Sequence, residues 1–332
     1  MSINPVEIPT GAVRYNTDSN KMEVYIGSTW MEVAVSTPNL DGGARGLWAG
    51  GDQPANINNI NFLTISTAGD ATDFGDLATV KSSFCAASNS TIAAWAGGYG
   101  SQNAIQTNIF SSTGNSVDTA DLQSNVLTPS GMSNETRGIF AGGQAANDNS
   151  NFTDDIDFVT IASKGNTTSF GNLTSRKRMD GGGQVSNSIR GLFWNTGGNT
   201  TAGHGVDSIT IASEGNAVFF ADGLTNESVP TCTSNKTRGV FAGGGDSSTT
   251  DIAYITYTTL GNTLKFGDLY AGNGYAAPAS DRITLVTGGG GGPTNRMDAV
   301  AIATGGTSVD FGDLTVSKTT ITGSSNGHGG LG

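Results

Sequence analysis

The feature that most constrains the fold of this chain is a seven-residue segment that recurs along it. The segment reads RGLWAGG at 45–51, RGIFAGG at 137–143 and RGVFAGG at 238–244. Gly-Gly pairs in related settings are 45 to 55 residues apart, which indicates an internal repeat. Glycine suits sharp turns and close backbone approach, so a pair directly after an apolar strand predicts a tight turn at a crowded rim. The pairs are at 50/51, 97/98, 142/143, 197/198, 243/244 and 288/289.

Each repeat contains four short segments of strand character. A polar loop and a second apolar strand, such as IDFVTIAS at 156–163, follow the Gly-Gly pair. A turn that often contains Gly-Asn leads to a third strand, which ends in FGDL or a variant of it. A strand of small residues then reaches a Ser-Asn turn before the next repeat. Strands of this length, repeated six times, predict a radially or linearly repeated all-β fold. Repeats of a β-solenoid, the competing architecture, are usually shorter.

The repeats resemble kelch repeats in the apolar strand that ends in Gly-Gly and in a fourth strand that follows Leu and a T-x-x-R or T-x-x-K segment. Examples of that segment are LTSRK at 173–177 and LTVSK at 314–318. The sequence departs from the kelch pattern where kelch repeats carry Tyr and Trp, because Ile, Phe or Val stand there. The resemblance implies an all-β fold, a six-bladed kelch-like β-propeller over residues 37–332 with a small N-terminal β-meander.

The C-terminal segment carries a spare copy of the small-residue strand. TVSKTTITGSSNG at 315–327 matches the pattern of TVKSSFCAASNS at 79–90, whereas almost nothing comparable precedes Arg45. This predicts that the C-terminal strand completes the first repeat and that Ile321 is buried there. We expect residues 328–332, beyond that strand, to matter little to folding.

Residues 1–36 lie outside the repeat. GAVRYNTDSNKMEVYIGSTW at 11–30 predicts a three-stranded meander with turns at NTDSN and GST. This segment is similar to one in bacteriophage tail fibres, and the RGxFAGG repeats are similar to those of structural proteins of marine phages. The resemblance implies a virion structural protein: a tail fibre, an appendage or a surface-decorating protein. It also implies binding to other virion proteins through the N-terminal module, a host surface glycan or protein as a further partner, and a homo-oligomer, a trimer by analogy.

Charge and composition disfavour several kinds of partner. A formal net charge of −12 argues against binding nucleic acid or an anionic membrane surface. Two cysteines and two histidines supply neither a disulfide framework nor a zinc motif, and no cofactor is expected. The five arginines beside the Gly-Gly strands could form a cationic ring or pack between repeats, and packing is favoured. They are Arg45, Arg137, Arg190, Arg238 and Arg282.

Candidate binding residues lie in the variable loops that follow the Gly-Gly pairs, since loops on a rigid scaffold commonly bind. His204 and His328 stand in glycine-rich sequence, where a solvated side chain is expected. Asp148, Asp154 and Asp155 could hold calcium, although a solvated loop is favoured because the EF-hand spacing is missing. The candidates are Asp52, Gln53, Asn56, Asn147, Asp148, Asp154, Asp155, His204 and Asp246.

No arrangement of catalytic residues emerges from the sequence, so we expect a protein that is not an enzyme. Neither histidine follows a recognisable nucleophile motif. The alternative is a propeller enzyme or lectin that acts on glycans, since a propeller fold alone does not decide function. A cellular kelch adaptor is a third class and is disfavoured.

Overall fold

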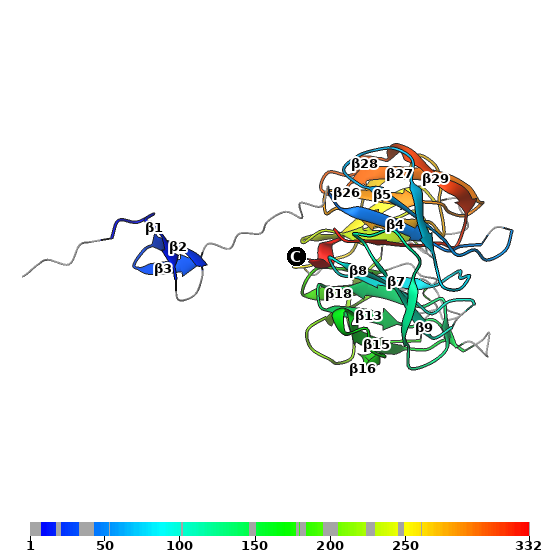
Figure 1. Ribbon diagram of the computed structural model, residues 1–332, viewed down its shortest axis with the longest axis horizontal. Coiled ribbons are helices and arrows are strands. Elements are labelled where there is room, and N and C mark those ends of the chain that lie inside the picture. The colour runs from blue at the N-terminus through cyan, green and yellow to red at the C-terminus, as the bar shows by residue number, and fades with distance from the viewer. Residues whose placement is uncertain are drawn as a thin grey trace, which may run out of the picture. The chain divides into compact units, whose positions relative to one another are not determined.

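The chain divides into two compact units, Met1–Leu40 and Asp41–Gly332. Both are built from β-strands, and the only helices among the described residues are the 3₁₀ turns η1 (Ile161–Ser163) and η2 (Gly329–Leu331). No described helix has the length and apolar character needed to cross a membrane. The computed structural model in Figure 1 describes residues 8–17, 21–32, 43–52, 54–100, 102–145, 151–176, 179, 184–194, 205–223, 230–244, 249–259 and 261–331.

The smaller unit contains an antiparallel sheet of three strands in the order β1-β2-β3. The strands are β1 (Val13–Asn16), β2 (Lys21–Ile26) and β3 (Thr29–Glu32). This is the three-stranded meander that the two turn signals predict.

The larger unit contains six sheets that share one strand order within the described residues. Each sheet begins with the strand of small residues, which we call the inner strand. The Gly-Gly strand, the second apolar strand and the strand of the FGDL segment, which we call the outer strand, follow in that order. Neighbouring strands are antiparallel, as in sheet 1. The all-β expectation is therefore confirmed. Sheet 1 is β30 (Thr322–Ser325), β4 (Arg45–Ala49), β5 (Asn59–Thr64) and β6 (Thr72–Asp76); sheet 2 is β7 (Cys85–Ser88), β8 (Ile92–Ala96), β9 (Ala104–Ile109) and β10 (Val117–Asp121); sheet 3 is β12 (Ser130–Ser133), β13 (Arg137–Ala141), β15 (Asp155–Thr160) and β16 (Thr168–Asn172).

The remaining three sheets follow the same plan. Sheet 5 gains a short fifth strand, β28 (Gly306–Thr307), which pairs in parallel with its outer strand, and β11 (Val126–Leu127) pairs separately with β14 (Gln144–Ala145). Sheet 4 is β17 (Gln184–Ser186), β18 (Arg190–Trp194), β19 (Gly205–Thr210) and β20 (Val218–Asp222); sheet 5 is β21 (Thr231–Ser234), β22 (Arg238–Ala242), β23 (Asp251–Thr256) and β24 (Leu264–Asp268); sheet 6 is β25 (Ala277–Ser280), β26 (Thr284–Gly288), β27 (Thr294–Ala301) and β29 (Val309–Lys318).

The continuous apolar run of each Gly-Gly strand is explained by burial on both faces. Successive side chains of a strand point to opposite faces, and here each face packs on a different neighbouring sheet. Leu47 packs in a core shared with sheet 2, and the adjacent Trp48 packs in a core shared with sheet 6. Ile139 and Phe140 divide in the same way between sheets 4 and 2.

Six such cores join the six sheets: 1 with 2, 2 with 3, 3 with 4, 4 with 5, 5 with 6, and 6 with 1. Figure 1 shows the last of these junctions, where the blue β4 and β5 lie beside the orange β27 and β29. The inner strands also contact one another, β7 with β12, β12 with β17, β17 with β21, β21 with β25, β25 with β30 and β30 with β7.

The C-terminal segment pairs with the first Gly-Gly strand, as the spare repeat copy predicts. β30 runs antiparallel to β4 with Thr322 opposite Ala49 and Ser325 opposite Gly46. Ile321 is buried, as expected, in the core that sheets 1 and 6 share.

The phase of one Gly-Gly pair differs from the sequence-based assignment. In the sixth repeat Gly288 is the last residue of β26, and the turn glycines with positive φ are Gly289 at 66° and Gly290 at 142°. They match Gly50 and Gly51 at 61° and 110°. In a run of five glycines the sequence does not show which two form the turn, and the pairing of the strands decides it. In the fourth repeat β18 ends at Trp194, and the Gly-Gly pair at 197/198 lies outside the described residues.

Candidate functional site

A cavity of about 80 Å³ lies where the six inner strands meet, and residues from all six line it. The last residue of every inner strand is a serine, which is followed by Asn or, in the sixth repeat, by Asp. Five of these six serines line the cavity, and Ser280 lies beside them in the same ring of strand ends. We call all six the serine ring: Ser88, Ser133, Ser186, Ser234, Ser280 and Ser325.

Hydrogen bonds join each pair of neighbouring strands in the serine ring. The hydroxyl of Ser133 donates to the carbonyl of Ser88 at 2.7 Å, and the hydroxyl of Ser88 donates to the carbonyl of Ser325 at 2.9 Å. Ser280 completes the set, since its N–H donates to the hydroxyl of Ser325 at 3.2 Å and its hydroxyl pairs with that of Thr233. The other two links are Ser186 Oγ to Ser133 O at 2.8 Å and Ser234 Oγ to Ser186 O at 2.6 Å.

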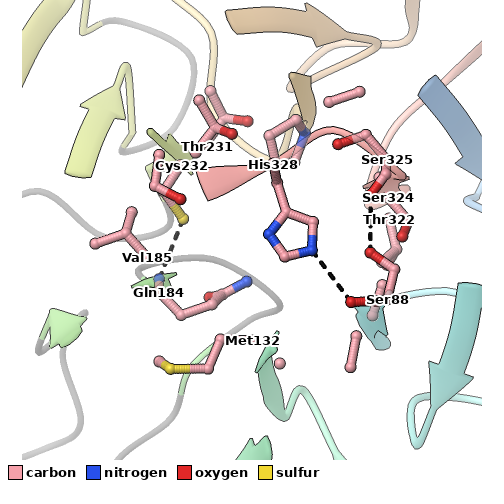
Figure 2. A pocket seen from close by; sticks show the side chains of 18 of the residues that line it. Ser88, Met132, Gln184, Val185, Thr231, Cys232, Thr322, Ser324, Ser325 and His328 are labelled. Carbon is pink, nitrogen blue, oxygen red and sulfur yellow. Dashed lines mark hydrogen bonds between the residues drawn. The ribbon is translucent and has the colours of Figure 1, made fainter. Parts of the chain in front are cut away.

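His328 extends into the cavity at the serine-ring end. Figure 2 shows its imidazole beside Ser88, joined to it by a dashed line. Nδ1 accepts a hydrogen bond from the N–H of Gly330 at 3.1 Å, so the proton of the neutral ring lies on Nε2, which is 3.2 Å from the carbonyl of Ser88. Burial lowers the pKa of His328 to about 4. The expectation of a solvated side chain is therefore wrong for His328.

This tautomer argues against His328 as a general base. Nε2 is 3.3 Å from the hydroxyl of Ser133. A base would need an unprotonated nitrogen facing that hydroxyl, but Nε2 carries the proton and the Ser133 hydroxyl already donates to Ser88. The arrangement holds the C-terminal tail in place rather than activating a nucleophile.

The tail beyond β30 closes this end of the cavity. η2 contacts β12 and β21, and the side chain of Arg282 donates to the carbonyl of Leu331 at 3.2 Å. Residues 328–331 are therefore part of the packed structure, contrary to the expectation that they matter little.

The rest of the cavity offers uncharged hydrogen-bonding groups. The hydroxyls of Thr231 and Ser324 are buried and have no hydrogen-bond partner in the structure. The sulfur of Cys232 accepts a hydrogen bond from the N–H of Gln184 at 3.1 Å (Figure 2). No described lining residue is an Asp, Glu, Lys or Arg. Because an unpaired buried hydroxyl costs about 1–3 kcal/mol, water or a small neutral ligand would suit these positions.

Two buried lysines, which sequence reasoning did not single out, tie neighbouring sheets together. Lys318 Nζ donates to the carbonyl of Trp48 and to Asn59 Oδ1, both at 3.3 Å. Lys81 Nζ donates to the carbonyls of Gly97 and Ala104, both at 3.1 Å. Burial lowers the pKa of Lys318 to about 7 and that of Lys81 to about 8. Their shared position, four residues after the Leu of each outer strand, was the available signal.

The arginines that begin the Gly-Gly strands are engaged between sheets. Arg190 donates to the carbonyl of Tyr257 at 2.6 Å and lies 5.0 Å over the ring of Phe220. Arg45 likewise donates to the carbonyl of Phe110 at 2.6 Å and lies over Phe62. Packing between repeats, the favoured expectation, is confirmed for these residues. Arg137 and Arg238 make the same pair of contacts, with Ile211 and Phe158 and with Ala303 and Tyr254.

The sequence-predicted binding residues fall into separate places. Asp52 and Asn56 lie in the β4–β5 loop of sheet 1 and pair with each other as an isolated bridge. Asp154 and Asp155 lie at the start of β15 in sheet 3, where Asp155 accepts a hydrogen bond from Thr153 at 2.6 Å. The remaining five candidates, Gln53, Asn147, Asp148, His204 and Asp246, lie outside the described residues.

The calcium alternative gains no support from the described part of the loop. Asp154 Oδ1 is 3.7 Å from Nε of Arg176, so an ion pair already neutralises the carboxylate that calcium would need. Among the residues that the structure describes, no group of three or more His, Cys, Asp and Glu side chains could hold a metal ion.

No protein-family model and no curated protein sequence matches the chain.

Proposed function

We propose that the six sheets of the larger unit are the blades of a six-bladed β-propeller of kelch-like type. The cycle of inner-strand contacts supports this, since it returns from β25 through β30 to β7. The six shared cores support it as well, because the core between sheets 6 and 1 joins the last repeat to the first. An experimentally determined structure of the full chain tests the proposal. A seventh blade, or two separately stacked groups of sheets, would contradict it.

We propose further that the protein is a bacteriophage virion structural protein: a tail fibre, an appendage or a surface-decorating protein. The observation that carries this is the N-terminal segment at 11–30, which is similar to tail-fibre segments and forms a unit separate from the repeats. The N-terminal unit binds other virion proteins, and the loops of the larger unit face a host surface glycan or protein. Attachment through one unit and display through the other are compatible with the division at Leu40.

The decisive experiment localises the protein. Particles of a phage that encodes the chain are purified on a density gradient, and the chain is sought by mass spectrometry and by immunogold labelling of intact virions. We expect a constant ratio of the chain to the major capsid protein across the particle peak. Presence in infected cells together with absence from particles would refute the virion role.

The second candidate is a lectin or enzyme that acts on glycans. The observation that favours it is the pair of unpartnered hydroxyls, Thr231 and Ser324, in a cavity whose described lining contains no Asp, Glu, Lys or Arg. Hydroxyl groups of a neutral sugar could hydrogen-bond with both. Binding of the full chain on a glycan array, followed by a search for turnover of any glycan that binds, separates lectin from enzyme and both from a purely structural protein.

A further inference from the structure

One face of the N-terminal sheet is apolar. Cross-strand partners share a face of a sheet, as do alternate residues of one strand. Val13 is opposite Val24, and Val24 is opposite Met31. Tyr15 is opposite Met22, and Ile26 follows Val24 by two positions. These six residues form what we call the apolar face: Val13, Tyr15, Met22, Val24, Ile26 and Met31.

The opposite face carries charge and is satisfied within the sheet. Arg14 Nε donates to Glu23 Oε2 at 2.7 Å, and Asn16 donates to the same carboxylate at 3.0 Å. The guanidinium of Arg14 lies 4.2 Å over the ring of Trp30. Trp30 in turn meets Tyr25 edge to face at 5.3 Å between ring centroids. The two aromatic side chains of this opposite face, Tyr25 and Trp30, therefore contact neighbours within the same sheet.

Most of the apolar face has no such cover among the described residues of this unit. Five of its six side chains expose about half of their surface or more, and Val24, in the middle strand, is partly buried. Small sheets need a second packed layer for stability, so this face requires a partner. The exposed fractions are 58% for Val13, 59% for Tyr15, 48% for Met22, 50% for Ile26 and 53% for Met31.

We infer that this partner is the same face of a second copy of the chain. The chain carries a net charge of −12, so contact between most surfaces of two copies brings like charges together. The apolar face has no charged residue, and it therefore lets two copies approach without that penalty. An apolar patch is complementary to itself, which is what an interface between identical subunits requires.

Sheet packing supplies the geometry of this interface. Two sheets stack face to face about 10 Å apart with interdigitated side chains. Met22 and Met31 are unbranched and adapt their shape to a facing surface. Glu23 and Glu32 lie opposite each other in the register of β2 and β3, on the other face of the sheet. Their side chains therefore point away from the interface. This inference does not depend on a virion location. It leaves the charged face available for other proteins.

The first test measures the mass of the full chain by sedimentation equilibrium in native form and in two variants. We expect the native chain to form dimers or higher oligomers. Met31→Lys places a charge in the interface and should weaken association at least about tenfold, or ~1.4 kcal/mol. Glu32→Lys, at the next residue on the opposite face, should leave association unchanged. A monomeric native chain, or a Met31→Lys variant that associates like the native chain, overturns the inference.

A second test does not depend on the fold tolerating a charge. Met31→Cys and Glu32→Cys are compared in the full chain with a short bismaleimide, which links two thiols that lie near each other. The native cysteines, Cys85 and Cys232, are buried and serve as the background. We expect covalent dimers from Met31→Cys and none above background from Glu32→Cys. Equal yields from the two variants, or no dimer from Met31→Cys, refute the face-to-face contact.

Discussion

The side-chain oxygen of Asn326 accepts a hydrogen bond from the backbone N–H of Arg45 at 2.7 Å, although 281 residues separate the two. In other repeats the same bond is local: Asn134 accepts from Arg137 at 2.8 Å, and Asn235 accepts from Arg238 at 2.8 Å. The Ser-Asn turn of the first repeat is thus divided between the two ends of the larger unit. Strand β30 carries the half that the N-terminal side lacks.

Truncation at the C-terminus tests this division. Ending the chain after Leu314 removes β30 and its pairing with β4, which leaves an unpaired strand edge that favours aggregation. We expect an insoluble product or a large fall in melting temperature. Ending it after Gly327 keeps β30 but removes the contacts of His328 and Leu331, and should cost about 1–3 kcal/mol of unfolding free energy. Equal melting temperatures for both truncations and the full chain would contradict the role of β30.

The serine ring predicts a cost for removing one hydroxyl. Ser133→Ala removes the bond to the carbonyl of Ser88 and the bond that Ser133 Oγ accepts from the N–H of Ser88. Both groups are buried, so we expect a loss of about 1–3 kcal/mol in urea denaturation. Ser90→Ala is the matched control, because Ser90 is only partly buried and its hydroxyl donates to the carboxylate of Glu135. A control loss as large as that of Ser133→Ala would argue against the ring.

Two glycines have nearly equal φ but different surroundings, so their Ala variants distinguish the cost of backbone strain from the cost of a steric collision. Gly75, in an FGDL segment, has φ of 143°, and a Cβ there would collide with the backbone of Gly114 in the next sheet. Gly69 has φ of 145° with open space around it. Both Ala variants should carry the backbone cost of about 1–3 kcal/mol. Gly75→Ala should lose clearly more unfolding free energy than Gly69→Ala, and equal losses would show that sheet contact does not require this glycine.

Lys318 predicts that stability rises with pH above neutrality. Its pKa is lowered in the folded chain to about 7, from an ordinary value of 10.5, so the unfolded chain binds more protons between these values. The unfolding free energy should rise by on the order of 1 kcal/mol per pH unit in that window from this group alone. Urea denaturation between about pH 7 and 9, where the folded and unfolded chains bind different numbers of protons, measures this rise. In Lys318→Met the unfolding free energy should rise less with pH than in the native chain.

Lys265→Met is the control for that experiment. Lys265 is exposed, and the hydrogen bonds that its ammonium donates to Asp251 and Asp268 raise its pKa, so it stays protonated in both states over the same range. Its removal should leave the slope with pH unchanged. An unaltered slope in Lys318→Met would show that the Lys318 ammonium is not destabilised by burial.

His328 predicts a neutral ring in mild acid. Burial lowers its pKa to about 4, below the ordinary 6.5, so protonation favours unfolding as the pH falls from the ordinary value towards 4. Nitrogen-detected NMR of the imidazole should report the Nε2–H tautomer at neutral pH and titration near pH 4. An ordinary pKa would contradict the desolvation of the ring, and the Nδ1–H tautomer would show that Gly330 does not donate to it.

The sequence alone determined the strand content and the repeat plan of this protein. Strands, turns and apolar runs are determined by nearby residues. The repeat contains six imperfect copies of a pattern like RGIFAGG, and their agreement strengthens the prediction from each copy. The spare copy at 315–327 could also be recognised, because its pattern is similar to that of residues 79–90. By contrast, the five glycines at 288–292 give no local indication of where the strand ends and the turn begins. The pairing of β26 with β27 places the start of the turn at Gly289.

The tertiary structure decided what the side chains do. The sequences around His328 and Lys318 are rich in small and polar residues and suggest exposure, yet sheets distant in sequence bury Lys318 and partly bury His328. The Ser-Asn turns read as simple turns, but their serines join neighbouring inner strands only when six repeats come together. Burial and hydrogen bonding between sheets depend on which surfaces meet, and that information is spread over the whole chain rather than held in any one segment.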